Sequence, residues 1–248
     1  MRLYYDAIWN APLLDACYVT PYNNSIRAGV AELADAADLK SAGAILVGSS
    51  PTPGTIKNKM MPWLVILLGY LLGAIPAGYL AGHMVRHVDI RQVGDLNMGA
   101  ANAYRQLGPK TGVIVGLVDA GKGALAVLIA QAWNMPFYTI LLVGTAAVIG
   151  HNWPLFIGFR GGRGVSTTIG VFLVVLTKPM LLVAGPAVLA LLIKRNVTLA
   201  CAILFISLPL VCWWLGSSAL MVSYSIALPG LIGITTFIRT RRRVPRHA

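Results

Sequence analysis

Residues 86–105, RHVDIRQVGDLNMGAANAYR, form the longest polar interruption in an otherwise apolar chain. They include three arginines, two asparagines and two of the eight acidic residues of the chain. Gly94 and Gly99 allow tight turns and a close approach of the backbone to a ligand. Guanidinium groups, amide side chains and backbone N–H groups are the usual ligands of a phosphate. The stretch therefore predicts that this loop, with a second one at residues 158–168, forms a phosphate site at a membrane surface.

The composition around this loop is that of a membrane protein. Of the 248 residues, 57% are hydrophobic and 11% are charged, and the mean hydropathy is +0.72. A soluble domain carries about 25% charged residues. We predict an all-α integral membrane protein with about seven transmembrane helices; six is the alternative. The predicted spans are residues 62–84, 111–133, 137–157, 166–177, 179–193, 197–215 and 218–238. The fourth and fifth are separated at Thr177-Lys178-Pro179, as two tilted helices or one re-entrant pair.

The distribution of basic residues predicts the orientation. Lys178 is the one basic residue in the predicted outer loops, whereas thirteen fall in the inner loops and the tail: Arg86, Arg91, Arg105, Lys110, Arg160, Arg163, Lys194, Arg195, Arg239, Arg241, Arg242, Arg243 and Arg246. By the positive-inside rule, both polar loops and the C-terminus face the cytoplasm, and the first span starts outside. This bias accounts for the net charge of +12, so we predict no nucleic-acid partner; no nucleic-acid-binding module is recognisable.

Residues 1–59 differ from the rest, with five basic and five acidic residues and no apolar run long enough to cross a membrane. Within them, SIRAGVAELADAADLKSAGAILVGSSPTPGT closely resembles the peptide read when a bacterial tRNA gene is translated by mistake. We therefore expect residues 1–59 to be a spurious or disordered extension, with the true start at Met60 or Met61. The alternative is a genuine extramembrane domain. Residues 60–238 are then the membrane domain and residues 239–248 a basic cytoplasmic tail.

The second polar loop lies in GHNWPLFIGFRGGRGVSTT, residues 150–168. Gly161, Gly162 and Gly164 surround Arg163, and we expect their N–H groups to point at one anion. A helix follows directly, and a helix N-terminus adds partial positive charge. Thr167 adds a hydroxyl group. The alternative interpretation is a tight turn between helices with arginines that extend to the membrane surface.

Charged residues also lie within the second predicted span. Asp119 and Lys122 are one helical turn apart and are predicted to pair. Lys122 either contacts an anionic substrate or belongs to a purely structural pair, since charges inside a span are costly and commonly functional. The surrounding GLVDAGKG lacks the Ser/Thr and the preceding strand of a P-loop. No metal site is predicted, because His83 and His87 lack the glutamate of the metalloprotease motif.

The two loops together resemble a known family. DIRQVGDLNMGAANAYR is similar to the first motif of the bacterial acyl-phosphate:glycerol-3-phosphate acyltransferases, and GHNWPLFIGFRGGRGVST is similar to their second. The resemblance implies an enzyme of the bacterial inner membrane that acts in phospholipid biosynthesis. It implies that an acyl chain moves from acyl phosphate to the 1-hydroxyl of glycerol 3-phosphate, giving lysophosphatidic acid. It implies that no cofactor is needed and that membrane lipids surround the protein. It does not predict an oligomeric state.

The resemblance also implies roles for individual residues. Asn97, Asn102 and Arg105 match the asparagines and the arginine of the first motif, and Arg163 stands where the second motif has a phosphate-binding lysine. We expect Arg105 and Arg163 to be catalytic by binding phosphate and stabilising developing charge. Asn97 and Asn102 would orient the substrates, with Lys122, Gly161, Gly162, Gly164 and Thr167 as further binding residues. Asp95 is the candidate general base for the acceptor hydroxyl.

The chain departs from the family pattern at several positions. Asp95 replaces the serine of the first motif, Ala101 replaces a threonine, and Cys201 replaces a serine early in the sixth span. The third motif, with a histidine and an asparagine after the last span, is absent from IRTRRRVPRHA. The competing hypothesis is therefore a non-catalytic phosphate- or lipid-binding membrane paralogue, or a transporter.

Overall fold

The computed structural model describes residues 61–241. The expectations for residues 1–59 and for most of the basic tail lie outside the described residues. The described chain is helical, in agreement with the predicted all-α class. Its elements are α4 (Pro62–Gly73), α5 (Ala77–Arg86), the 3-10 turn η1 (Ile90–Gln92), α6 (Ala100–Leu107), α7 (Pro109–Ala132), α8 (Phe137–Asn152), the 3-10 turn η2 (Leu155–Ile157), α9 (Val165–Val175), α10 (Thr177–Lys194), α11 (Val197–Trp214) and α12 (Ala219–Arg241).

Six helical stretches of the described chain are long and apolar enough to cross a membrane: Pro62–Arg86, Pro109–Ala132, Phe137–Ile157, Thr177–Lys194, Val197–Trp214 and Ala219–Arg239. The seventh predicted span corresponds to α9, which has 11 residues. At 1.5 Å per residue, α9 is about 16 Å long, about half the thickness of the hydrocarbon core. Residues 61–241 therefore contain six full-length candidate spans and one short apolar helix, where the sequence predicted about seven spans.

The boundary between α9 and α10 lies two residues earlier than predicted. The chain leaves helical geometry at Leu176, and Thr177, Lys178 and Pro179 form the first turn of α10. Proline is tolerated in a first turn because the N–H groups there have no acceptor within the helix. The Thr177 hydroxyl donates back to the carbonyl of Leu173 across the boundary. With these three residues α10 has 18 residues in total and is long enough to be a full-length span.

The first span is interrupted at Ala74–Pro76, between α4 and α5. Pro76 accounts for this break, because proline removes one helical hydrogen bond. At Pro186, Pro209 and Pro229 the helices α10, α11 and α12 continue through the proline. The interruption at Pro76 leaves the carbonyl of Ile75 to accept from the Lys122 ammonium at 2.8 Å. This contact ties the first span to α7 beside the polar loops.

Small residues bring the helices close together. α4 packs on α8, and α7 packs on α9. At Gly73 a Cβ would overlap the carbonyl of Ala147 on α8, and at Gly170 it would overlap the carbonyl of Ala120 on α7. Only a glycine fits where the backbone of the neighbouring helix is this close.

Replacing Gly73 by alanine is expected to destabilise the protein by about 1–3 kcal/mol, because the added methyl group must displace backbone of α8. Gly121 on α7 is a matched control, since a Cβ there meets nothing within 4 Å. Gly121→Ala should be neutral or stabilise by about 0.5–1 kcal/mol, as alanine is the better helix former. Unfolding in detergent, followed by tryptophan fluorescence, measures both; equal stabilities would contradict the close packing of α4 on α8.

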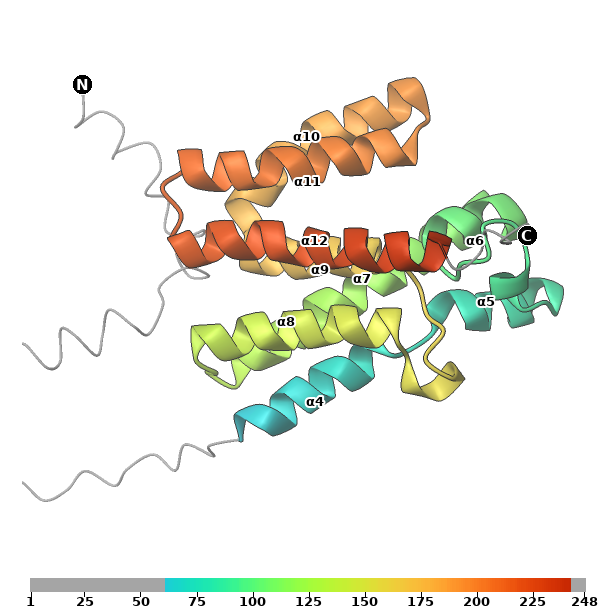
Figure 1. The fold of residues 1–248 in the computed structure, drawn as a ribbon, viewed down its shortest axis with the longest axis horizontal. Coiled ribbons are helices and arrows are strands. Elements are labelled where there is room, and N and C mark those ends of the chain that lie inside the picture. The colour runs from blue at the N-terminus through green and yellow to red at the C-terminus, as the bar shows by residue number, and fades with distance from the viewer. Residues whose placement is uncertain (1–60, 242–248) are drawn as a thin grey trace, which may run out of the picture. The chain divides into compact units, whose positions relative to one another are not determined.

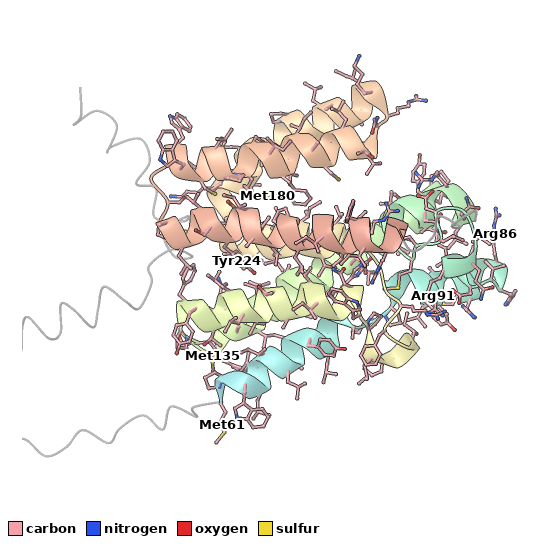
Figure 2. All side chains as sticks on the ribbon, in the orientation of Figure 1. Met61, Arg86, Arg91, Met135, Met180 and Tyr224 are labelled. Carbon is pink, nitrogen blue, oxygen red and sulfur yellow. The ribbon has the colours of Figure 1, made fainter. Side chains whose placement is uncertain are left out.

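Both polar loops lie at one end of the helices, where α5 and α6 also gather (Figure 1). The turn between α10 and α11 and the C-terminal part of α12 lie at the same end (Figure 1). Figure 2 places Arg86 and Arg91 at this end and Met61 and Met135 at the opposite one. The segments that the charge pattern assigned to one face of the membrane therefore share one end of the fold.

Candidate active site

The first loop, residues 87–99, is organised around the side chain of Asn102. This residue is 0% exposed. Its Oδ1 accepts from the backbone N–H of Asp95 at 2.9 Å, and its Nδ2 donates to the carbonyls of Ile90, Val93 and Asn97 at 3.1, 3.0 and 2.7 Å. Asn102 was expected to orient a substrate. The observed contacts all lie within the loop, so they support a role in fixing the loop conformation.

Arg91 joins the first loop to the second. Its Nη2 lies 2.8 Å from Asp89 Oδ2, and its guanidinium carbon lies 4.7 Å from the centre of the Tyr79 ring. Its Nη1 donates to the carbonyls of Ile157 and Arg160, at 2.9 and 3.4 Å. The hydrogen bond from Arg91 holds the pKa of Asp89 below its usual value. The ion pair therefore persists at neutral pH and is lost only as the pH falls through that lowered pKa.

Two of the three predicted catalytic residues contact each other. Arg105, in the last turn of α6, pairs through Nη2 with Asp95 Oδ2 at the mouth of the first loop. Both side chains are exposed, at 49% and 40%. A guanidinium group has five N–H donors in a planar fork, so one carboxylate leaves donors for a second anion. The pair therefore suits a site where Asp95 orients Arg105 and a phosphate binds its other edge.

The backbone of the second loop folds back on α8. The N–H groups of Gly161 and Gly162 donate to the carbonyls of Asn152 and His151, at 3.2 and 3.0 Å. The expectation that these two N–H groups point at an anion is therefore wrong, because both already have acceptors. At Gly162 a Cβ would overlap the imidazole of His151. Gly164, the third glycine, has φ +86°, a conformation that strongly favours glycine.

The N-terminal turn of α9 is the position in this loop best suited to an anion. Arg163 is half-buried and immediately precedes Gly164, where α9 begins. The first N–H groups of a helix have no acceptor within it, and the helix dipole adds partial positive charge. The side-chain oxygen of Asn152 faces this turn, since a Cβ on Gly164 would lie 2.7 Å from Asn152 Oδ1.

Buried polar atoms gather beside this turn. Within residues 61–241, both side-chain polar atoms of Asn152 and the hydroxyls of Thr167 and Thr168 are buried and have no hydrogen-bond partner. Most buried polar atoms in proteins have one, and an unpaired one costs about 1–3 kcal/mol. Such a cluster at the start of α9 is expected where a ligand or an ordered water molecule completes the hydrogen bonds.

The predicted pair of Asp119 and Lys122 is confirmed, and His151 extends it. Lys122 Nζ lies 2.9 Å from Asp119 Oδ1, and His151 Nδ1 lies 3.4 Å from the same oxygen. The three side chains are at least 96% buried. Lys122 also donates to the carbonyl of Ile75. These contacts favour the structural alternative for Lys122 over a contact with substrate.

Sequence reasoning did not single out His151, Asn152 or Arg239, and it counted Arg91 only as one of the three arginines of the first loop. His151 and Asn152 lie in the second loop, where the predicted anion site was assigned to the glycines and Arg163. A signal for His151 existed in principle, since a buried carboxylate such as Asp119 needs more than one partner. Arg239 was counted only among the basic residues that set the positive-inside bias.

Comparison with known proteins agrees with this arrangement. The family model described as glycerol-3-phosphate acyltransferase matches residues 63–247. Glycerol-3-phosphate acyltransferase 4 of Dehalococcoides mccartyi is 47% identical over 182 residues, which are 73% of this chain and 98% of that protein. Glycerol-3-phosphate acyltransferase of Synechococcus sp. (strain CC9902) is 38% identical over 163 residues, 66% of this chain and 82% of that protein.

Solved structures show the same fold. The crystal structure of PlsY (YgiH), described as an integral membrane glycerol 3-phosphate acyltransferase in its glycerol 3-phosphate form, is 33% identical, with a TM-score of 0.66. The lysophosphatidic acid form is 32% identical, with a TM-score of 0.64. Each comparison covers 73% of this chain and 90% of the other. The family model spans both loops and reaches the basic tail, and this chain belongs to the glycerol-3-phosphate acyltransferase family.

Proposed function

We propose that this chain transfers an acyl group from acyl phosphate to the 1-hydroxyl of glycerol 3-phosphate, giving lysophosphatidic acid and phosphate. Membership of the glycerol-3-phosphate acyltransferase family makes the chain a membrane acyltransferase. The observation that carries the more specific proposal is the junction of two cationic loops through Arg91 at one end of the membrane-spanning helices. Both substrates bear phosphate, and Arg105 and the N-terminal turn of α9 supply two places to bind it.

The chemistry needs only binding, orientation and a proton acceptor. The carboxyl carbon of acyl phosphate is already activated as a mixed anhydride. The glycerol oxygen attacks this carbon, the bond from the carbon to the phosphate oxygen breaks, and phosphate leaves with the electron pair. Negative charge develops on the acyl oxygen and on the leaving phosphate, where Arg105, Arg163 and the start of α9 would stabilise it. Asp95 would take the proton of the attacking hydroxyl.

The loops would face the cytoplasm of a bacterial inner membrane. In support, thirteen of the basic residues fall in segments assigned to that side, against Lys178 on the other. In further support, the polar loops and the turn between α10 and α11 lie at one end of the helices (Figure 1), and Arg86 and Arg91 lie there too (Figure 2). The acyl chain could then remain between helices while both phosphate groups stay in the polar mouth.

Product formation by purified protein tests the proposal. The full chain, and alongside it a protein begun at Met60, would receive acyl phosphate and glycerol 3-phosphate in detergent. Phosphate and lysophosphatidic acid should appear together and should both be lost in Arg105→Ala. Phosphate without lysophosphatidic acid would indicate another acceptor. Bound substrate without either product would favour the non-catalytic paralogue.

Replacing Asn152 by leucine, or Thr167 by valine, is expected to raise the KM for a phosphate substrate about tenfold, the effect of losing one hydrogen bond of about 1.4 kcal/mol. Stability should stay the same or rise, because each change removes buried polar atoms that have no partner among the described residues. Steady-state kinetics and thermal unfolding measure the two effects.

Thr139 supplies the matched control, as its buried hydroxyl also lacks a partner within residues 61–241 but lies at the start of α8. Thr139→Val should change stability in the same direction and leave KM unchanged. If Asn152→Leu and Thr167→Val also left KM unchanged, these polar atoms would not belong to the substrate site.

A further inference from the structure

Arg239, in the C-terminal part of α12, reaches the second loop. Its Nη1 donates to the carbonyls of Gly161 and Gly162, at 2.9 and 2.5 Å, and its Nη2 donates to the carbonyl of Asn152. Its guanidinium carbon lies 5.9 Å from the centre of the Trp153 ring. One side chain of the last helix therefore holds both ends of the loop, where α8 stops and where the glycines lead into α9.

The contacts require the shape of a guanidinium group. The two terminal nitrogens of Arg239 lie in one plane and donate to three backbone carbonyls. Two of these carbonyls belong to residues 77 and 78 positions before Arg239 in the chain. A lysine ammonium has the same charge, but its three donors radiate from one atom and cannot reach the same set of acceptors. The loop is therefore shaped for arginine at position 239 rather than for any cation.

The carbonyls held by Arg239 lie next to the candidate anion site. Gly161 and Gly162 directly precede Arg163, and Asn152 carries the side chain that faces the first turn of α9. Carbonyl oxygens carry partial negative charge, which would repel a phosphate unless a cation or a donor compensates it. Arg239 supplies that compensation from α12, while Arg91 binds the carbonyls of the earlier part of the loop.

We propose that Arg239 is a positioning residue for acyl transfer, which clamps the second loop so that Arg163 and the N-terminal turn of α9 bind substrate phosphate. The inference rests on the proposed function and adds a role for the last helix, whose end lacks the third family motif. Arg239 acts through the backbone of the loop and does not itself contact substrate.

Two variants and a control test the kinetic consequence. Arg239→Ala and Arg239→Lys should each lower kcat/KM about tenfold to a hundredfold, an effect of about 1.4–2.7 kcal/mol. Arg195→Ala removes an exposed arginine in the turn between α10 and α11. This turn lies at the same end of the helices (Figure 1), and the variant should retain the wild-type kcat/KM. Methylguanidinium should restore part of the activity of Arg239→Ala, whereas methylammonium should not. Full activity of Arg239→Lys would overturn the inference, because a point charge would then suffice.

Hydrogen–deuterium exchange measures the clamp without relying on activity. Peptides that cover residues 152–165 should exchange faster in both Arg239 variants than in wild type, whereas Arg195→Ala should leave them unchanged. Unchanged exchange would overturn the clamp, and faster exchange with wild-type kcat/KM would overturn its role in positioning.

If Arg239→Ala does not fold, Arg239→Lys keeps the charge and the aliphatic stem and gives the same comparison. If the wild-type protein makes no lysophosphatidic acid, the proposed function is contradicted. Faster exchange in the Arg239 variants would in that case still support the contacts of Arg239 with the loop.

Discussion

Replacing Lys122 by methionine is expected to destabilise the protein by about 3–5 kcal/mol, the usual cost of leaving one member of a buried ion pair without its partner. Lys122 Nζ lies 2.9 Å from Asp119 Oδ1, and both side chains are at least 96% buried. Methionine has a similar volume, so the loss reflects charge rather than packing. Thermal or denaturant unfolding in detergent measures it. Lys194→Met, at an exposed position in the last turn of α10, should cost no more than about 0.5 kcal/mol.

The double variant Asp119→Leu with Lys122→Met separates pairing from the other contacts of these residues. If the two charges chiefly compensate each other, the double variant should be more stable than Lys122→Met alone, because it leaves no uncompensated carboxylate. Additive losses would show that the pair is not coupled. A stable Lys122→Met protein with greatly reduced kcat/KM would instead support the alternative that Lys122 contacts substrate.

Hydropathy predicted the fold well because the lipid phase imposes a simple requirement on sequence. An apolar run of about 20 residues has to be helical to satisfy its backbone hydrogen bonds. The prediction erred at α9, where residues 166–177 are apolar but the helix ends at Val175. Helix length there depends on the turn at Leu176, which brings Thr177–Pro179 into α10. Composition alone does not determine such a turn.

The residue types at the site could be predicted from sequence, but their hydrogen bonds could not. An asparagine in a glycine-rich loop is equally suited to hold a substrate or the loop itself, and Asn102 makes four contacts with the loop. The N–H groups of Gly161 and Gly162 looked available until the fold brought the end of α8 beside them. Arg239 was hidden for the same reason, since no periodic pattern indicates a partner 77 residues away.

The Asp95→Asn variant is expected to lose about a hundredfold or more in kcat while retaining the wild-type KM, because positioned bases commonly contribute 10²- to 10⁴-fold. Asparagine keeps the shape of aspartate and can still contact Arg105, but it cannot accept a proton at neutral pH. Initial rates of lysophosphatidic acid formation, with each substrate varied in turn, give both constants. Unchanged turnover would exclude Asp95 as the base.

The ion pair with Arg105 provides the competing explanation, and the same kinetics separate the two. If Asp95 only orients Arg105, the change to asparagine weakens an exposed pair, and KM should rise while kcat stays close to wild type. Asp95→Ser offers a second comparison, because the resemblance places a serine at this position in the family. A serine variant with full activity would show that the chemistry does not need a carboxylate here, and that a shorter side chain with a hydroxyl group can take its place. A serine variant as slow as Asp95→Asn would mean that this chain has come to depend on the carboxylate.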